Sequence, residues 1–194
     1  MNITLRNIIR RATLATVALL LSFGIAGAQI DLRISKSKIK SSLKRLDKLE
    51  LLAAQLNTAS GSTQAAADLL CQIAKQCIEL SERISHYINQ VNVLGTLQAS
   101  SEKVLQRTLL LTKLDSLSKE LASHKESISS IGSSIMSTGA SSSASSSTSS
   151  GTSSSASSKA LKSIGAKILK IAEKEYLYQA MAVGNMISAL GTMK

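Results

Sequence analysis

Four side chains of this sequence could carry chemistry: two thiols, Cys71 and Cys77, and two imidazoles, His86 and His124. On one straight helix the α-carbons of the two cysteines would lie about 9 Å apart along the axis, beyond the roughly 7 Å that a disulfide spans. We therefore interpret Cys77 as a small buried apolar residue and Cys71 as the candidate for a disulfide to another chain. A helix break between them would instead permit a local bridge. Two thiols with distant histidines are too few ligands for a zinc site.

The histidines have simpler interpretations than catalysis. His86 follows Glu82 by one helical turn, a spacing that could orient an imidazole for proton transfer but that a solvent-facing ion pair also needs. His124 falls on an apolar face, where we expect a core histidine or a polar group that sets helix register. No Ser-His-Asp arrangement, glycine-rich phosphate loop or apolar carboxylate pair can be recognised. We predict a protein that is not an enzyme and binds no cofactor and no metal.

A row of lysines is more informative, because Lys36, Lys40, Lys44 and Lys48 recur every four residues and share one helix face. Each like-charged neighbour costs a few tenths of a kcal/mol in an isolated helix. We call this row the lysine stripe and predict that it meets an anionic partner: phospholipid, acidic polysaccharide or acidic protein. A solvated surface helix is the alternative. Nucleic acid is a weaker candidate, because one Phe, three Tyr and no Trp offer few platforms for base stacking.

Long helices must position these residues, and the clearest periodicity runs from Ala66 to Leu94 in alternating steps of four and three. Such spacing predicts a helix with one apolar seam that packs on a partner helix, as in a coiled coil. The seam comprises Leu70, Ile73, Cys77, Leu80, Ile84, Tyr87, Val91 and Leu94. Similar patterns predict helices over 31–58 and 96–136. Three helices with short turns predict an all-α fold with an antiparallel bundle over residues 29–136.

A fourth helix is expected over residues 159–194, after a Ser-rich segment. Residues 137–158 contain only Ser, Thr, Ala and Gly, a composition typical of a flexible, disordered linker. The last 18 residues before Lys194 carry no charge, and they include a ladder of small residues at Ala180, Gly184 and Ser188 that would allow close helix contact. We expect this apolar half to be buried in the bundle or in an oligomer interface, with insertion into a membrane surface as the alternative.

The first 28 residues have the order of a secretory signal peptide: a basic start, an apolar run of about 14 residues and a small-residue end at Ala26 to Ala28. A membrane-spanning helix would need roughly 20 apolar residues. Export would place the protein in the periplasm, at the cell surface or in the extracellular fluid. The chain has 23 Lys plus Arg, 12 Asp plus Glu and no proline, so it is basic, and a loop-rich β fold is disfavoured.

These observations predict an exported, non-catalytic helical protein that acts by binding or assembly. Self-association or a protein partner would cover the apolar seams, and an anionic surface or partner would meet the basic ends. The sequence leaves two alternatives open. One is a membrane-active protein whose C-terminal helix inserts into lipid, and the other is a component of a pilus or secretion apparatus, which rests on analogy of architecture alone.

Overall fold

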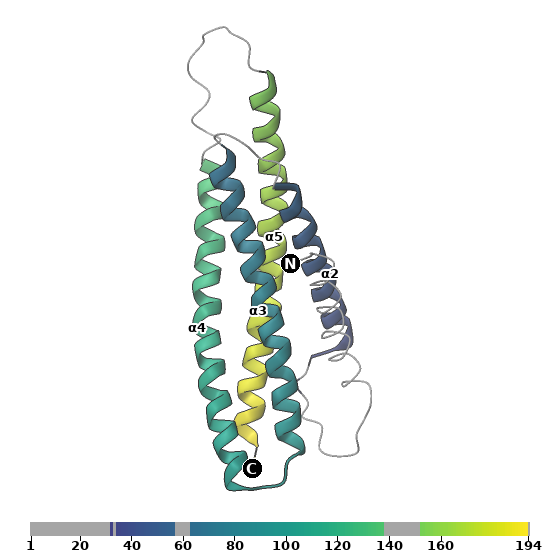
Figure 1. Ribbon diagram of the computed structural model, residues 1–194, viewed down its shortest axis with the longest axis vertical. Coiled ribbons are helices and arrows are strands. Elements are labelled where there is room, and N and C mark those ends of the chain that lie inside the picture. The colour runs from purple at the N-terminus through teal and green to yellow at the C-terminus, as the bar shows by residue number, and fades with distance from the viewer. Residues whose placement is uncertain (1–31, 33, 57–62, 138–151, 194) are drawn as a thin grey trace. The chain divides into compact units, whose positions relative to one another are not determined.

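A computed structural model of the chain describes residues 32, 34–56, 63–137 and 152–193. Within these residues the regular secondary structure is helical, which confirms the predicted all-α fold. Four α-helices follow one another in the described ranges (Figure 1): α2 (Lys36–Leu56), α3 (Gln64–Thr96), α4 (Ser101–Ser137) and α5 (Thr152–Thr192). The expected signal peptide, residues 1–28, lies outside the described residues.

Serine residues define two of the helix starts. As α2 begins, the Ser35 hydroxyl accepts from the Lys38 backbone N–H at 3.4 Å, and the Ser35 carbonyl accepts from the Lys38 and Ile39 N–H groups at 3.0 and 3.2 Å. At the start of α4, the Ser100 hydroxyl accepts from the Lys103 backbone N–H at 3.1 Å, as an N-cap does. The apolar spacing predicted a start near Thr96, but Thr96 instead ends α3, and α4 begins only after the capping serine.

Helix α5 begins at Thr152, not at Lys159, so it extends into the segment expected to be a linker. The costly step in helix formation is the first turn, whereas each further residue adds one hydrogen bond for one residue fixed. A Ser- and Ala-containing stretch next to an established helix can therefore continue it. Residues 138–151 of the expected linker lie outside the described residues.

The chain forms two compact units, each built from parts of all four helices. The first unit contains Met1–Ser42, Glu79–Leu121 and Tyr178–Lys194, and the second contains Leu43–Ile78 and Ala122–Leu177. The division between the units therefore crosses each of the four helices rather than the turns that connect them.

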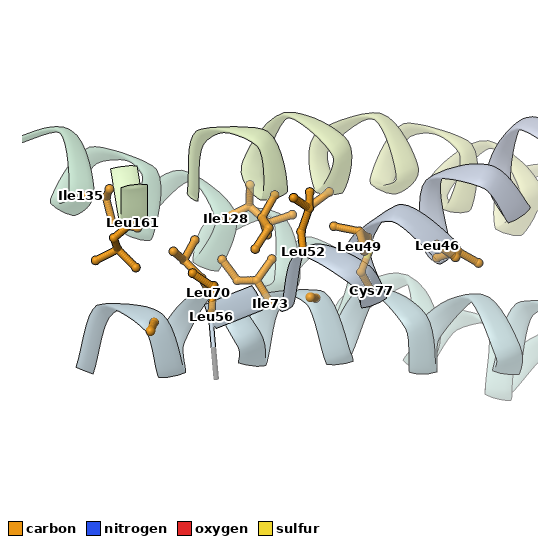
Figure 2. Close-up of a cluster of buried hydrophobic side chains, with 14 residues drawn as sticks. Leu46, Leu49, Leu52, Leu56, Leu70, Ile73, Cys77, Ile128, Ile135 and Leu161 are labelled. Atoms are coloured by element: carbon orange, nitrogen blue, oxygen red, sulfur yellow. The ribbon is translucent and has the colours of Figure 1, made fainter. Parts of the chain in front are cut away.

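The second unit is organised around an apolar cluster to which all four helices contribute (Figure 2). Its large members are fully or almost fully buried: Leu46, Leu49, Leu52, Leu56, Leu70, Ile73, Cys77, Ile128, Ile135, Leu161 and Ile168. Burying one such side chain contributes about 1.5–3 kcal/mol. This cluster therefore supplies the main force that holds the helix segments of this unit together.

Gly165 brings α5 close to α3 within this cluster. A Cβ added at Gly165 would lie 2.9 Å from Cδ1 of Leu70 and 3.8 Å from Cδ1 of Ile135. The absent side chain thus makes room for a leucine from α3 and an isoleucine from α4. The sequence had instead suggested Gly184 and Ser188 as close-contact positions, but both are exposed, and a Cβ at Gly184 would meet nothing within 4 Å.

In the first unit, α3 and α4 form a helical hairpin, connected through residues 97–100 (Figure 1). The apolar end of α5 packs in the same unit, where Ala182, Val183, Met186 and Leu190 are buried. Polar contacts hold it there as well. Gln179 donates to the Ser81 hydroxyl at 2.7 Å, with both residues buried, and Asn185 donates to the Leu32 carbonyl at 2.7 Å.

Candidate functional site

The predicted seam of α3 lies mostly inside each unit. Seven of its eight residues are buried, whereas Tyr87 is only half-buried and its neighbour Ile88 takes the inward position with 2% exposure. The exchange is limited to this turn of the helix, since Val91 and Leu94, the next two residues of the predicted seam, are buried again.

The lysine stripe lies on α2, opposite a face whose inward positions include Ile39, Leu46 and Leu49. All four of its members, Lys36, Lys40, Lys44 and Lys48, are exposed. Lys36 and Lys40 belong to the first unit, and Lys44 and Lys48 belong to the second. No ion pair or hydrogen bond joins any of the four side chains to another described residue. The stripe thus presents four ammonium groups to its surroundings along one continuous helix.

Arg45 lies on the same helix but turns inward to a buried carboxylate. Its Nε donates to Oε2 of Glu175 at 2.7 Å, and the Glu175 side chain is 0% exposed while that of Arg45 is 22% exposed. The sequence reasoning missed this pair, although a signal was present. Glu175 follows Ile168 and Ala172 at helical spacing, and all three are buried on α5, so a carboxylate at a core position could have been recognised.

His124 is a core residue of the second unit, 4% exposed. Its Nδ1 lies 3.1 Å from Oε1 of Gln76 on α3, and its buried Nε2 has no hydrogen-bond partner among the described residues. Burial lowers the pKa of His124 below its ordinary value of 6.5, because a charged imidazolium loses its hydration there. The position suits a neutral polar contact between two helices rather than proton transfer to a solvent-borne substrate.

Both cysteines lie on α3 in the second unit. Cys77 is buried in the apolar cluster. Cys71 is half-buried, and its thiol donates to the Ala53 carbonyl at 3.5 Å. Burial raises the pKa of the Cys71 thiol, an effect that nearby Lys75 partly opposes and Asp68 adds to. A disulfide from Cys71 to another chain stays a prediction, and the raised pKa would slow its formation, since the thiolate is the reactive form.

His86 is exposed in the first unit, where its Nε2 lies 2.9 Å from Nε2 of Gln90. The expected ion pair with Glu82 is replaced by this contact with an amide. Within the described ranges, no group of three or more His, Cys, Asp or Glu side chains is arranged to hold a metal ion.

No protein-family model, curated protein or solved structure matches this chain. None of the four described helices combines the length and the apolar character required to cross a membrane. The function of the chain must therefore be inferred from the geometry and chemistry of its own residues.

Proposed function

We propose that this chain is an exported, non-catalytic helical protein that acts by binding, and that the lysine stripe of α2 contacts an anionic surface or partner. One observation carries the proposal. Four exposed lysines share one face of a helix whose other face is buried, and none of them meets a carboxylate among the described residues. The secretory pattern of the first 28 residues supports the exported location.

The stripe has the dimensions of a site for an extended array of anions. At 1.5 Å per residue its charges are spaced about 6 Å apart and extend over roughly 18 Å of helix. Each lysine near an anionic lipid surface contributes about 1 kcal/mol to binding. Four therefore give roughly 4 kcal/mol, or about a thousandfold in affinity at low salt. An anionic partner would also relieve the repulsion between neighbouring lysines.

Membrane insertion through α5 is the second candidate, and the packing of α5 favours surface binding over it. The apolar residues that would enter lipid include Met186 and Leu190, which are already buried in the first unit. Insertion would first have to remove them from that core and break the contact of Gln179 with Ser81. Binding through the stripe requires no such rearrangement.

The test replaces Lys36, Lys40, Lys44 and Lys48 together with Gln and measures binding to heparin and to vesicles containing acidic phospholipid. A matched control replaces Lys159, Lys167, Lys170 and Lys174 of α5, which are also exposed, and so removes the same charge elsewhere. We expect the stripe variant to lose most of its affinity and salt dependence, while the control retains most of both. Vesicles of neutral lipid should bind neither protein.

Equal losses of affinity in the two variants would show that binding depends on net charge rather than on a specific surface. The proposal that the lysine stripe is the binding surface would then be wrong. Unchanged binding in the stripe variant would overturn this proposal as well. Release of dye from the acidic vesicles, abolished by truncation at Ser158, would favour insertion of α5 instead. Export has its own readout, because the mature protein recovered from outside the cell should begin at Gln29.

A further inference from the structure

The α3–α4 hairpin of the first unit exposes an unusual amount of apolar surface. Eight large hydrophobic side chains are exposed among the described residues, and five of them lie on this hairpin. They are Val93 (61% exposed), Leu97 (40%), Val104 (60%), Leu105 (60%) and Leu109 (54%). Single exposed leucines are ordinary, but clusters of exposed apolar residues mark surfaces that bind other molecules.

An open groove of about 360 Å³ runs between the two helices within this surface. Val93 and Leu94 from α3 and Leu109 and Leu110 from α4 provide its apolar lining. Leu94 and Leu110 are buried, so they form its floor, whereas Val93 and Leu109 stand exposed at its sides. A groove with apolar walls between two antiparallel helices is the shape that accepts the apolar face of a third helix.

The polar groups of the groove select the charge of its occupant. Lys113 and His86 are the titratable residues that line it, together with amides such as Asn89, and no carboxylate is among the lining residues. The Lys113 ammonium makes no ion pair or hydrogen bond with another described residue. An occupant with carboxylates beside its apolar face would complement this surface.

We propose that the groove of the α3–α4 hairpin binds an amphipathic helix of a partner protein that carries acidic residues beside its apolar stripe. The lining from His86 to Leu94 extends over roughly 12 Å of α3, enough for three anchors at i, i+3 or i+4, and i+7. The exposed Val104 and Leu105 lie outside the groove lining but on the same hairpin, and a helix-sized partner would cover more of this apolar surface than a small molecule. The chain has 23 Lys plus Arg against 12 Asp plus Glu, so an acidic partner helix complements the charge of a groove lined by Lys113 better than a second copy of this basic chain does.

The test uses a displayed library of amphipathic helices with fixed leucines at the anchor spacing and with Glu, Gln or Lys at the flanking positions. Selection on the full chain should enrich Glu at the flanks. Leu109→Ser should weaken the selected helices at least tenfold, and Lys113→Glu should shift the selection from Glu to Lys. Leu177→Ser is the matched control, because Leu177 is 66% exposed in the second unit and its replacement should leave binding unchanged. Thermal unfolding of each variant checks that it is folded.

Three results would overturn the proposal: no enrichment over the Leu109→Ser protein, enrichment without acidic flanks, or equal losses from Leu109→Ser and Leu177→Ser. A concentration-dependent increase in the native mass that Leu109→Ser abolishes would assign the groove to a second copy instead. Tight binding of a fatty acid that competes with the selected helices would assign it to a small amphipathic ligand. The lysine stripe is intact in all these variants, so failure of this test leaves the proposed function of α2 unaffected, and the converse also holds.

Discussion

The two units of this protein contain similar polar features but place them differently. Each has an Arg–Glu pair: Arg45–Glu175 of the second unit includes a fully buried carboxylate, whereas both members of Arg83–Glu120 in the first unit are 45% exposed. Both units bury apolar side chains, but the described residues expose five large apolar side chains on the hairpin of the first unit and three in the second unit, Leu51, Leu69 and Leu177. The two units therefore differ in the burial of their ion pair and in the apolar surface that the described residues expose.

The largest expected effect separates the two ion pairs. Arg45→Met removes the cation from a buried carboxylate and should destabilise the fold by about 3–5 kcal/mol. Arg83→Met removes the corresponding cation of an exposed pair and should cost about 0–1 kcal/mol. Urea unfolding of both variants measures the difference. Similar losses of stability in the two variants would mean that burial of the Glu175 carboxylate does not make the Arg45–Glu175 pair more important than the exposed Arg83–Glu120 pair.

The next effect compares two glycines of α5. Gly184→Ala places a methyl group where nothing lies within 4 Å and should stabilise the helix by roughly 0.5–1 kcal/mol. Gly165→Ala gains the same helix propensity but pushes against buried Leu70, and overpacking a core costs about 1–3 kcal/mol. We therefore expect thermal midpoints to rise for Gly184→Ala and to fall for Gly165→Ala. A higher thermal midpoint for both variants would show that the contact between α5 and α3 can accommodate a methyl group at position 165.

The smallest effect is a dependence on pH that belongs to the second unit. Because burial lowers the pKa of His124, the folded state binds fewer protons than the unfolded state once the pH falls below about 6.5. The neutral histidine therefore contributes its full stability above that pH. The contribution decreases as the pH falls through 6.5 and levels off below the folded-state pKa. His124→Gln should flatten this part of the stability profile measured by urea unfolding.

A control for this pH effect comes from the first unit. Ser81→Ala disturbs the buried contact with Gln179, which contains no titratable group, and should lower stability by a similar amount at every pH. If His124→Gln also changed the free energy of unfolding by the same amount at every pH, histidine protonation would have no role in the pH dependence.

Most of the helical structure could be predicted from apolar spacing, because a repeat of three and four residues fits only a helix with one buried face. The seam of α3 follows that rule closely, and His124 lies on the buried face of α4 as its position on an apolar face predicts. Helix ends were less predictable, since a single serine such as Ser100 shifts the start of α4. The exposed position of the lysine stripe follows from its placement opposite the apolar positions of α2.

The contacts between helices were not predictable in the same way. Glu175 could be assigned to the apolar face of α5, but its partner could not, because α2 precedes α5 by about a hundred residues or more and nothing in the local pattern relates the two. The same holds for Gly165, whose role depends on Leu70 approaching from another helix. The groove of the α3–α4 hairpin was missed because Val93 and Leu109 are apolar residues outside the main seams, and only packing shows that they stay exposed.

The amino-acid sequence by itself determined that this protein is helical, where its apolar seams lie and that a row of lysines occupies one face of α2, because these properties depend on the local geometry of a single helix. The tertiary structure decided which buried residues of different helices contact each other, that Glu175 forms an ion pair with Arg45, and that apolar residues of the hairpin border an open groove. These properties depend on side chains that are distant in the sequence, and their proximity is set by the packing of whole helices.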